Sequence, residues 1–277
     1  MSQADRLIAT AVKELGYAEK RTNAQLDSPT ANAGSANFTK YARDLDALGT
    51  FYNGPKNGFA WCDVFVDWCF VETFGAELAL KLLCQPQKST GAGCTYSAQF
   101  YKAAGRFVKT PQPGDQIFFT KDGSKTSNHT GIVERVDGVK VYTVEGNTSS
   151  AAGVVANGGA VCRKSYALTS ASIMGYGRPN WSLVPETRTS RQIVQDAAGL
   201  SDGTMDYLAA YRWGKDLLDK LAAAIRIGAV VAAGQGWTSR QLVQAAAGLS
   251  DGTMQYLEDY RWGKDLLDKL TAAITKQ

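Results

Sequence analysis

Apolar positions repeat with a helical period near the N-terminus and alternate with strand-like spacing further along. Residues 1–20 carry an apolar side chain every three or four positions, and Gly16 marks where a helix is expected to end. Residues 60–74 (AWCDVFVDWCFVETF) form a second, strongly apolar helix candidate. Strand-like runs, separated by Gly, Asp and Asn, follow at 116–120, 131–136, 139–145 and 173–178. Helices followed by antiparallel strands predict an α+β domain.

The C-terminal third is an internal duplication. Residues 189–225 recur as residues 238–274 with an offset of 49, and the copies differ at only six aligned pairs. Thr189 and Gln192 have capping-box spacing, and the glycines that follow are placed to end or separate helices. Each copy is predicted to be a small bundle of three short helices, close to the lower size limit for independent folding.

These patterns divide the chain into a mixed domain and two repeats. We expect the domain at 1–180, a linker at 181–188, repeat 1 at 189–226, an inter-repeat linker at 227–237 and repeat 2 at 238–277. No signal peptide precedes the first helix, and no apolar run reaches transmembrane length. Five cysteines without a disulfide-framework spacing suit reduced thiols. The protein is therefore expected to be made in a cytoplasm and not to insert into a membrane.

The formal net charge of +4 is unevenly distributed. Each repeat core carries four basic and five acidic residues, so the remainder holds about +6. Such a surplus favours association with anionic polymers such as teichoic acids. It is too diffuse to indicate a nucleic-acid partner.

The chain has a single histidine, His129, and so a single imidazole for general-base chemistry. His129 precedes a strand-like run, which places it at a sheet edge. Cys62 opens the apolar helix candidate, where free N–H groups and the helix dipole favour a thiolate and can contribute to an oxyanion hole. Cys94, at another loop-to-helix junction, is the alternative nucleophile. The non-catalytic interpretation is a structural histidine and a buried core cysteine.

A third group is needed to orient the imidazole. Glu145 ends the strand that follows His129, and a hairpin would bring its carboxylate alongside the ring. Asn147 is the alternative orienting residue, or a polar contact for substrate. Taken alone, Glu-Gly-Asn is an ordinary turn sequence. It indicates a catalytic role only in combination with Cys62 and His129.

Four motifs in this order resemble those of the CHAP family, the cysteine, histidine-dependent amidohydrolases/peptidases of phage endolysins and bacterial autolysins. They are WCDVFV at 61–66, PGD at 113–115, HTGIVE at 129–134 and EGN at 145–147. The resemblance covers about residues 1–180. It implies a papain-like α+β fold, a thioester mechanism and peptidoglycan as substrate. The amide cut would be the muramic acid–L-alanine link or a bond within the peptide.

Carried over by position, the resemblance implies that Cys62 is the nucleophile, His129 the base and Glu145 the orienting residue, with Asn147 a fourth polar member. The NlpC/P60 enzymes share the cysteine–histidine order and are the close alternative. The resemblance also implies a phage endolysin that stays in the host cytoplasm until lysis and then acts at the cell wall. Alternatives are a secreted autolysin or interbacterial effector, and a wall-binding protein without activity.

Cofactor requirements are expected to be small. Some CHAP domains bind calcium near the nucleophile, and residues 23–37 offer Asp27, Asn32 and Asn37 here. These include only one carboxylate, whereas Ca²⁺ usually takes more anionic oxygen. Zinc is not expected, because one histidine and scattered cysteines lack ligand spacing. We therefore expect no required cofactor, with calcium as the one ion to test.

The repeats are expected to bind the cell wall, as such repeats do in endolysins. An aromatic ring beside Arg and Lys suits a sugar ring that carries a carboxylate or peptide. The candidates are Tyr211, Arg212, Trp213 and Lys215 in the first copy and Tyr260, Arg261, Trp262 and Lys264 in the second. The alternative is that the aromatic residues pack the small core. A monomer is expected, and the competing role is oligomerisation through the apolar run 227–233.

Overall fold

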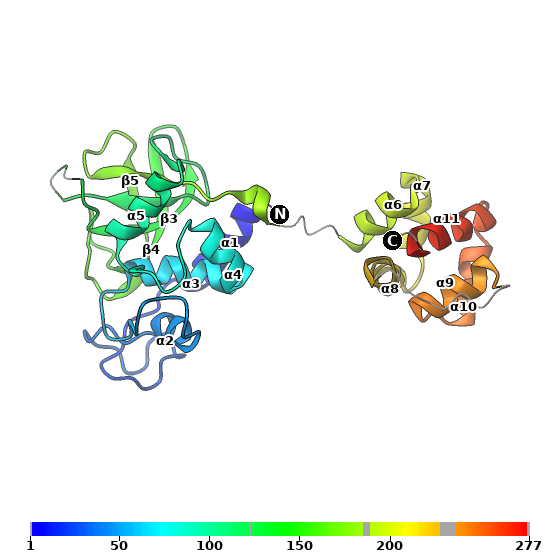
Figure 1. Cartoon of the computed structure of the whole chain (residues 1–277), viewed down its shortest axis with the longest axis horizontal. Helices are drawn as coiled ribbons and strands as arrows, with labels where there is room; N and C mark the ends of the chain where they lie inside the picture. The colour runs from blue at the N-terminus through cyan, green and yellow to red at the C-terminus, as the bar shows by residue number, and fades with distance from the viewer. Residues whose placement is uncertain (1, 122, 124, 185–188, 228–236, 276–277) are drawn as a thin grey trace. The chain divides into compact units, whose positions relative to one another are not determined.

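The computed structural model describes residues 2–121, 123, 125–184, 189–227 and 237–275. The chain divides into two compact units, Met1–Pro185 and Glu186–Gln277 (Figure 1). Among the described residues, no helix is both long and apolar enough to span a bilayer.

The N-terminal unit is built on a six-stranded antiparallel sheet with the order β1-β6-β2-β3-β4-β5. Its strands are β1 (Phe107–Val108), β2 (Gln116–Phe119), β3 (His129–Val136), β4 (Lys140–Thr148), β5 (Ala160–Ala167) and β6 (Ile173–Gly177). The α+β prediction therefore agrees with the structure, and β2, β3, β4 and β6 coincide with the four expected strands to within a few residues. The sequence analysis did not identify β1 or β5.

One buried helix packs against this sheet. It is α3 (Cys62–Phe74), in which nine of 13 residues are buried, because it contacts β3 and β4 on one side and other helices elsewhere. The surrounding helices are α1 (Gln3–Lys13), α2 (Lys40–Ala47), α4 (Ala76–Leu82) and α5 (Cys94–Ala103). Figure 1 shows α1 and α4 beside α3. A helix covered on all sides must be apolar around its whole circumference, which explains the sequence of this segment.

The N-terminal unit extends further along the chain than expected. Trp181, in the 3₁₀ helix η1 (Trp181–Leu183), stacks on Phe70 of α3 with ring centroids 6.2 Å apart and an interplanar angle of 7°. Residues 181–184 therefore belong to this unit rather than to the linker expected at 181–188.

The C-terminal unit contains three helices from each copy. They are α6 (Ser190–Ala198), α7 (Asp202–Ala210) and α8 (Gly214–Ile227), then α9 (Ser239–Ala247), α10 (Asp251–Glu258) and α11 (Gly263–Thr275). The capping boxes at Thr189 and Thr238 are both formed, and Gly199 and Gly248 end the first helices in the left-handed conformation, each with φ 59°. Local sequence therefore predicted these helix ends correctly.

The two copies do not form separate bundles, which corrects the expectation of two small units. Their buried side chains make one continuous core, with α11 packed on α6 and α8 and with α8 also against α9. A single copy of this size buries little apolar surface, so pairing supplies the missing core. The run 227–233, considered for oligomerisation, lies outside the described residues except for residue 227.

Candidate active site

Cys62 is the first residue of α3, and its side chain is nearly buried, with 7% of its surface exposed. Trp61 precedes it as the N-cap residue, and no side chain caps the helix. Trp61 is itself buried and its Nε1 donates a hydrogen bond of 2.7 Å to Oε2 of Glu19, which fixes the approach to the helix. The first-turn N–H groups have no intrahelical partners, so without a capping side chain they can receive an oxyanion beside the Cys62 sulfur.

His129 begins β3 and lies against β4. Its Nε2 is 2.9 Å from Oε2 of Glu145, and both side chains are fully buried. Thr143 donates a hydrogen bond of 2.5 Å to Oε1 of Glu145, and Tyr166 donates one of 3.2 Å to Oε2. Because a carboxylate only accepts hydrogen bonds, this environment suits an ionised Glu145. The expected hairpin relationship between His129 and Glu145 is present.

The two ring nitrogens of His129 differ in their surroundings. Among the described residues, Nδ1 is buried and has no hydrogen-bond partner. The imidazole ring stacks on the ring of Phe119, with centroids 5.8 Å apart and an interplanar angle of 26°. Nε2 is bonded to Glu145 and the ring packs on Phe119, and neither contact joins His129 to Cys62, the nucleophile expected from the sequence.

Gly146 allows α3 to approach β4 closely. A Cβ at this position would lie 2.5 Å from Cβ of Phe65 and 2.9 Å from the ring of Trp61. Any side chain here would push α3 away from the sheet. The glycine of the Glu-Gly-Asn motif therefore brings the nucleophile helix against the strand that carries Glu145.

Cys94, the alternative nucleophile, lies beside Cys62 in the structure. It is the first residue of α5, its exposed fraction is 8%, and its Sγ donates a hydrogen bond of 3.2 Å to the carbonyl oxygen of Ser127. The Cys62 and Cys94 thiols lie close enough for each to shift the pKa of the other. The two candidates from the sequence therefore belong to one site.

Burial and the neighbouring Cys94 thiol act against the thiolate that the helix start was expected to favour at Cys62. The pKa of Cys62 is raised well above its ordinary value, first by the hydrogen bond to Cys94 and then by burial. The same hydrogen bond lowers the pKa of Cys94. Two adjacent buried thiols do not readily ionise together, so a nucleophile at Cys62 requires a base that removes its proton.

Asp63 is a further buried group of the site, and the sequence analysis missed it. It accepts hydrogen bonds from Ser97 Oγ of α5 at 2.6 Å and from Gln116 Nε2 of β2 at 2.9 Å. The same Gln116 nitrogen donates to Thr130 Oγ1, next to His129, at 3.1 Å. Burial raises the pKa of Asp63 to about 6, against the effect of these hydrogen bonds. The available signal was the presence of acidic residues, Asp63 and Asp67, within a strongly apolar helix.

Asn147 is directed to a loop rather than to the histidine ring. Its Oδ1 accepts a hydrogen bond of 3.3 Å from the Gly159 amide, and its backbone has φ 53° in the irregular stretch of β4 between Glu145 and Thr148. Its Nδ2 is buried without a hydrogen-bond partner among the described residues. The contacts of Asn147 therefore support the shape of the strand end.

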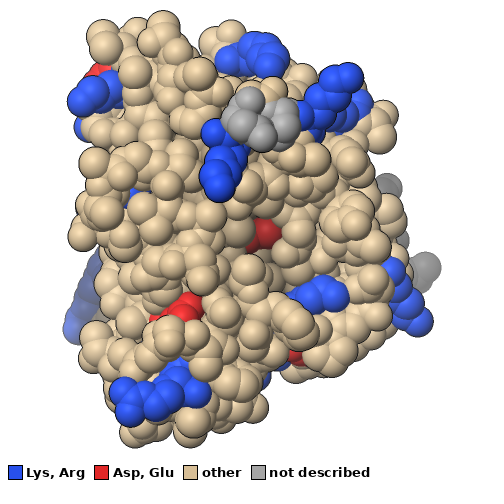
Figure 2. All heavy atoms as spheres, turned by 90° about the vertical axis from the view of Figure 1, so that its left-hand side faces the viewer, with Lys and Arg blue, Asp and Glu red and all other residues tan. Residues whose placement is uncertain are grey.

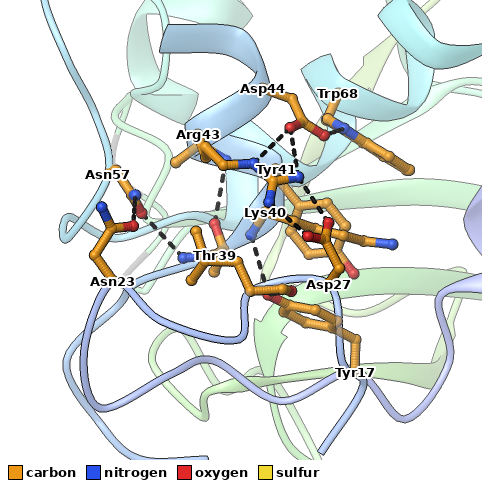
Figure 3. A network of polar contacts seen from close by, with 12 residues as sticks. Tyr17, Asn23, Asp27, Thr39, Lys40, Tyr41, Arg43, Asp44, Asn57 and Trp68 are labelled. Carbon is orange, nitrogen blue, oxygen red and sulfur yellow. Dashed lines mark hydrogen bonds and ion pairs between the residues drawn. The ribbon is translucent and has the colours of Figure 1, made fainter. Parts of the chain in front are cut away.

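In residues 23–37, the stretch considered for calcium, the single carboxylate is paired with an arginine. Both carboxylate oxygens of Asp27 accept from the Arg43 guanidinium, at 2.7 and 2.9 Å (Figure 3). Asn32 donates through Nδ2 to Thr22 and to the Ala24 carbonyl. No cluster of three or more His, Cys, Asp or Glu side chains suited to a metal occurs among the described residues. Arg43 thus occupies Asp27, whereas Oδ1 of Asn37 is buried without a hydrogen-bond partner among the described residues. The expectation that no cofactor is required stays a prediction.

The repeat residues expected to bind the wall fall into two groups. Trp213 and Trp262 are 57% and 56% exposed, with the guanidinium groups of Arg212 and Arg261 each 5.0 Å from the adjacent ring centroid. Tyr211 and Tyr260 instead lie between the two copies. The core-packing alternative therefore applies to the tyrosines and not to the tryptophans.

Lys215 and Lys264 complete the expected set. Lys215 pairs with Asp219 one helical turn away, at 2.7 Å, and its side chain is largely exposed. Lys264 lines a shallow surface pocket with Arg240, Glu258 and Asp268. Neither lysine contacts the tryptophan of its own copy in any interaction that the structure describes.

On the face of the N-terminal unit shown in Figure 2, most of the charged side chains are basic. Lys and Arg side chains dominate its charged surface, and the face is hollowed near its middle. This agrees with the basic surplus outside the repeats and suits an anionic polymer.

Comparison with known proteins identifies the family of this region. A family model described as the CHAP domain matches residues 54–147, a range that includes Cys62, His129, Glu145 and Asn147. No curated protein and no solved structure matches the chain. The match to the CHAP domain supports a cysteine- and histidine-dependent amidohydrolase or peptidase in the N-terminal unit.

Proposed function

We propose that this protein is an endolysin-type peptidoglycan hydrolase that cuts a cell-wall amide through Cys62. The observation that carries the proposal is the buried His129–Glu145 pair within the CHAP match, with Nδ1 of His129 unpartnered. The separate helical unit supports a second role, which is to hold the enzyme on the wall. We place the site of action at the cell wall.

The proposed reaction has two stages, acylation of Cys62 and hydrolysis of the thioester. His129 Nδ1 removes the Cys62 thiol proton as the sulfur attacks the amide carbonyl carbon, and the first-turn N–H groups of α3 stabilise the oxyanion. The imidazolium, stabilised by Glu145, gives its proton to the leaving nitrogen as the C–N bond breaks. Water, deprotonated by His129, then hydrolyses the thioester to a carboxylate and restores the Cys62 thiol.

The test uses purified bacterial sacculi and the full chain. We expect the wild type to lower the turbidity of the suspension, and Cys62→Ala and His129→Ala to be inactive. Glu145→Gln keeps the side-chain shape but loses the charge that stabilises the imidazolium, so we expect a loss of about 100-fold or more. Cys84→Ala, which removes a partly exposed thiol in the loop after α4, is the matched control and should keep full activity. Activity that survives both Cys62→Ala and His129→Ala would contradict the mechanism.

Mass spectrometry of the soluble products identifies the bond. Stem peptides released with a free L-alanine amine indicate an N-acetylmuramoyl-L-alanine amidase. Fragments cut within the peptide or its cross-bridge indicate an endopeptidase. Binding to sacculi with no released product from the wild type would indicate a wall-binding protein instead.

A further inference from the structure

The two repeats are joined by a nearly symmetric set of tyrosine contacts. Tyr207 and Tyr256 stack with centroids 4.4 Å apart and an interplanar angle of 10°. The hydroxyl of each donates to the backbone carbonyl of the other. Tyr260 pairs with Thr204 at 3.1 Å, and the equivalent Tyr211 pairs with Thr253 at 3.2 Å. Such reciprocal contacts are those of a two-fold interface.

A hollow of about 280 Å³ opens at this interface, and both copies line it. The first copy contributes the corner between α6 and α7, including Ser201. The second copy contributes Trp262, Asp265 and Lys269 from the start of α11. The hollow therefore requires residues from both copies.

The symmetry implies a second, equivalent hollow. All nine residues that line the first one have identical counterparts at an offset of 49, because the six differences between the copies fall elsewhere. The local geometry is repeated too: Lys269 pairs with Asp265 at 2.9 Å, and Lys220 pairs with Asp216 at 3.0 Å. In the second hollow, Trp213 would face the α9–α10 corner that contains Ser250.

The chemistry of the lining favours a neutral sugar ring. Trp262 presents an exposed indole, on which the C–H face of a pyranose can stack. The serine hydroxyl, the carboxylate and the ammonium provide both acceptors and donors for sugar hydroxyl and amide groups. The acid and the lysine are already paired, so the lining offers no net charge to select an anionic polymer.

We propose that the duplication creates two glycan-binding pockets, each assembled from both repeats, which take the amino-sugar strand of peptidoglycan. The choice of this glycan rests on the proposed function of the N-terminal unit. A repeating polymer can occupy both pockets of one molecule at once, which raises the overall affinity without further contacts.

The first experiment measures binding of the full chain to purified sacculi by co-sedimentation. All variants carry Cys62→Ala, so that the sacculi stay intact. We expect Trp213→Ala and Trp262→Ala each to weaken binding by about ten-fold or more, and to similar extents, because each removes one of two linked sites. The double variant should be weaker still. Trp237→Ala is the matched control, since Trp237 is 44% exposed but lies outside the hollow.

The second experiment tests whether a pocket is shared between copies. Ser201→Asp keeps a good helix N-cap but places a carboxylate in the hollow that contains Trp262. If the pocket is shared, adding Ser201→Asp to Trp262→Ala causes little further loss of sacculus binding. The reason is that Trp262→Ala has already removed the indole ring from the same pocket. Adding it to Trp213→Ala should reproduce the double tryptophan variant, because both pockets are then damaged.

Other results would overturn the proposal. These are coupling of Ser201→Asp with Trp213 rather than Trp262, no effect of Ser201→Asp, and unchanged binding in the double tryptophan variant. Absence of sacculus binding by the Cys62→Ala parent would overturn the glycan assignment. Because co-sedimentation needs no hydrolysis, these outcomes are distinguishable from failure of the proposed enzymatic activity.

Discussion

Gly131 and Glu145 lie so close together on neighbouring strands that a Cβ on Gly131 would stand 2.5 Å from Cγ of Glu145. Gly131 is two residues after His129 on β3, so its missing side chain leaves the space through which the Glu145 carboxylate reaches the imidazole. The His-Thr-Gly motif thus supplies both the base and the room for its partner.

Gly131→Ala should therefore displace Glu145 from His129. Overpacking of this kind costs about 1–3 kcal/mol, and we expect hydrolysis of sacculi to slow by about ten-fold or more as the ring loses its orienting partner. Hydrolysis rate and thermal unfolding measure the two effects. Gly54→Ala is the matched control, because a Cβ there meets no atom within 4 Å. An active Gly131→Ala enzyme would show that Glu145 does not need its observed position.

Cys94→Ala should make Cys62 ionise at lower pH. The hydrogen bond to Cys94 is the largest cause of the raised pKa of Cys62, so its removal lowers that pKa and moves the acid limb of thiol reactivity to lower pH. Iodoacetamide labelling of the Cys62 peptide, followed by mass spectrometry across pH, measures this without any substrate. Cys84→Ala should leave the profile unchanged. An identical profile in Cys94→Ala would contradict the coupling of the two thiols.

Asp63 should make the protein less stable as pH rises. Its pKa in the folded protein is about 6, above the ordinary 3.8, so the folded state holds more protons between these values. Stability from this group is therefore complete below pH 3.8 and is lost as pH rises through about 6, by up to about 3 kcal/mol.

Urea unfolding of wild type and Asp63→Asn at several pH values tests this. The free energy of unfolding of the wild type should fall relative to that of the variant between pH 4 and 7. Any pH-independent effect of the amide cancels when the differences at two pH values are compared. A difference that is constant over this range would mean that Asp63 is not held in a raised-pKa environment.

Chelation should not inactivate the enzyme. Arg43 occupies both oxygens of Asp27, the single carboxylate of the stretch considered for calcium. We expect the same melting temperature and hydrolysis rate with EDTA and with added Ca²⁺, because a cation would first have to displace the guanidinium. Arg43→Ala frees Asp27 and is the informative comparison. A clear rise in the melting temperature of the wild type with Ca²⁺ would show a site that this arrangement does not provide.

Local sequence was sufficient for much of the architecture. Helix α3, the strand beginning at His129, and the caps at Thr189 and Gly199 were all predicted correctly or to within a few residues. Helix ends and periodic apolar faces depend on interactions between residues a few positions apart, so the pattern contains them. The His129–Glu145 partnership could also be predicted, because one hairpin links the two residues.

Other features needed the tertiary structure. The proximity of Cys62 and Cys94, which raises the pKa of Cys62, joins the starts of two helices far apart in the chain. The placement of Tyr211 and Tyr260 between the repeats likewise depends on how two nearly identical copies pack together. A residue's pKa and burial are set by whichever distant groups come to surround it. The sequence indicated candidate residues, and long-range packing decided which of them meet.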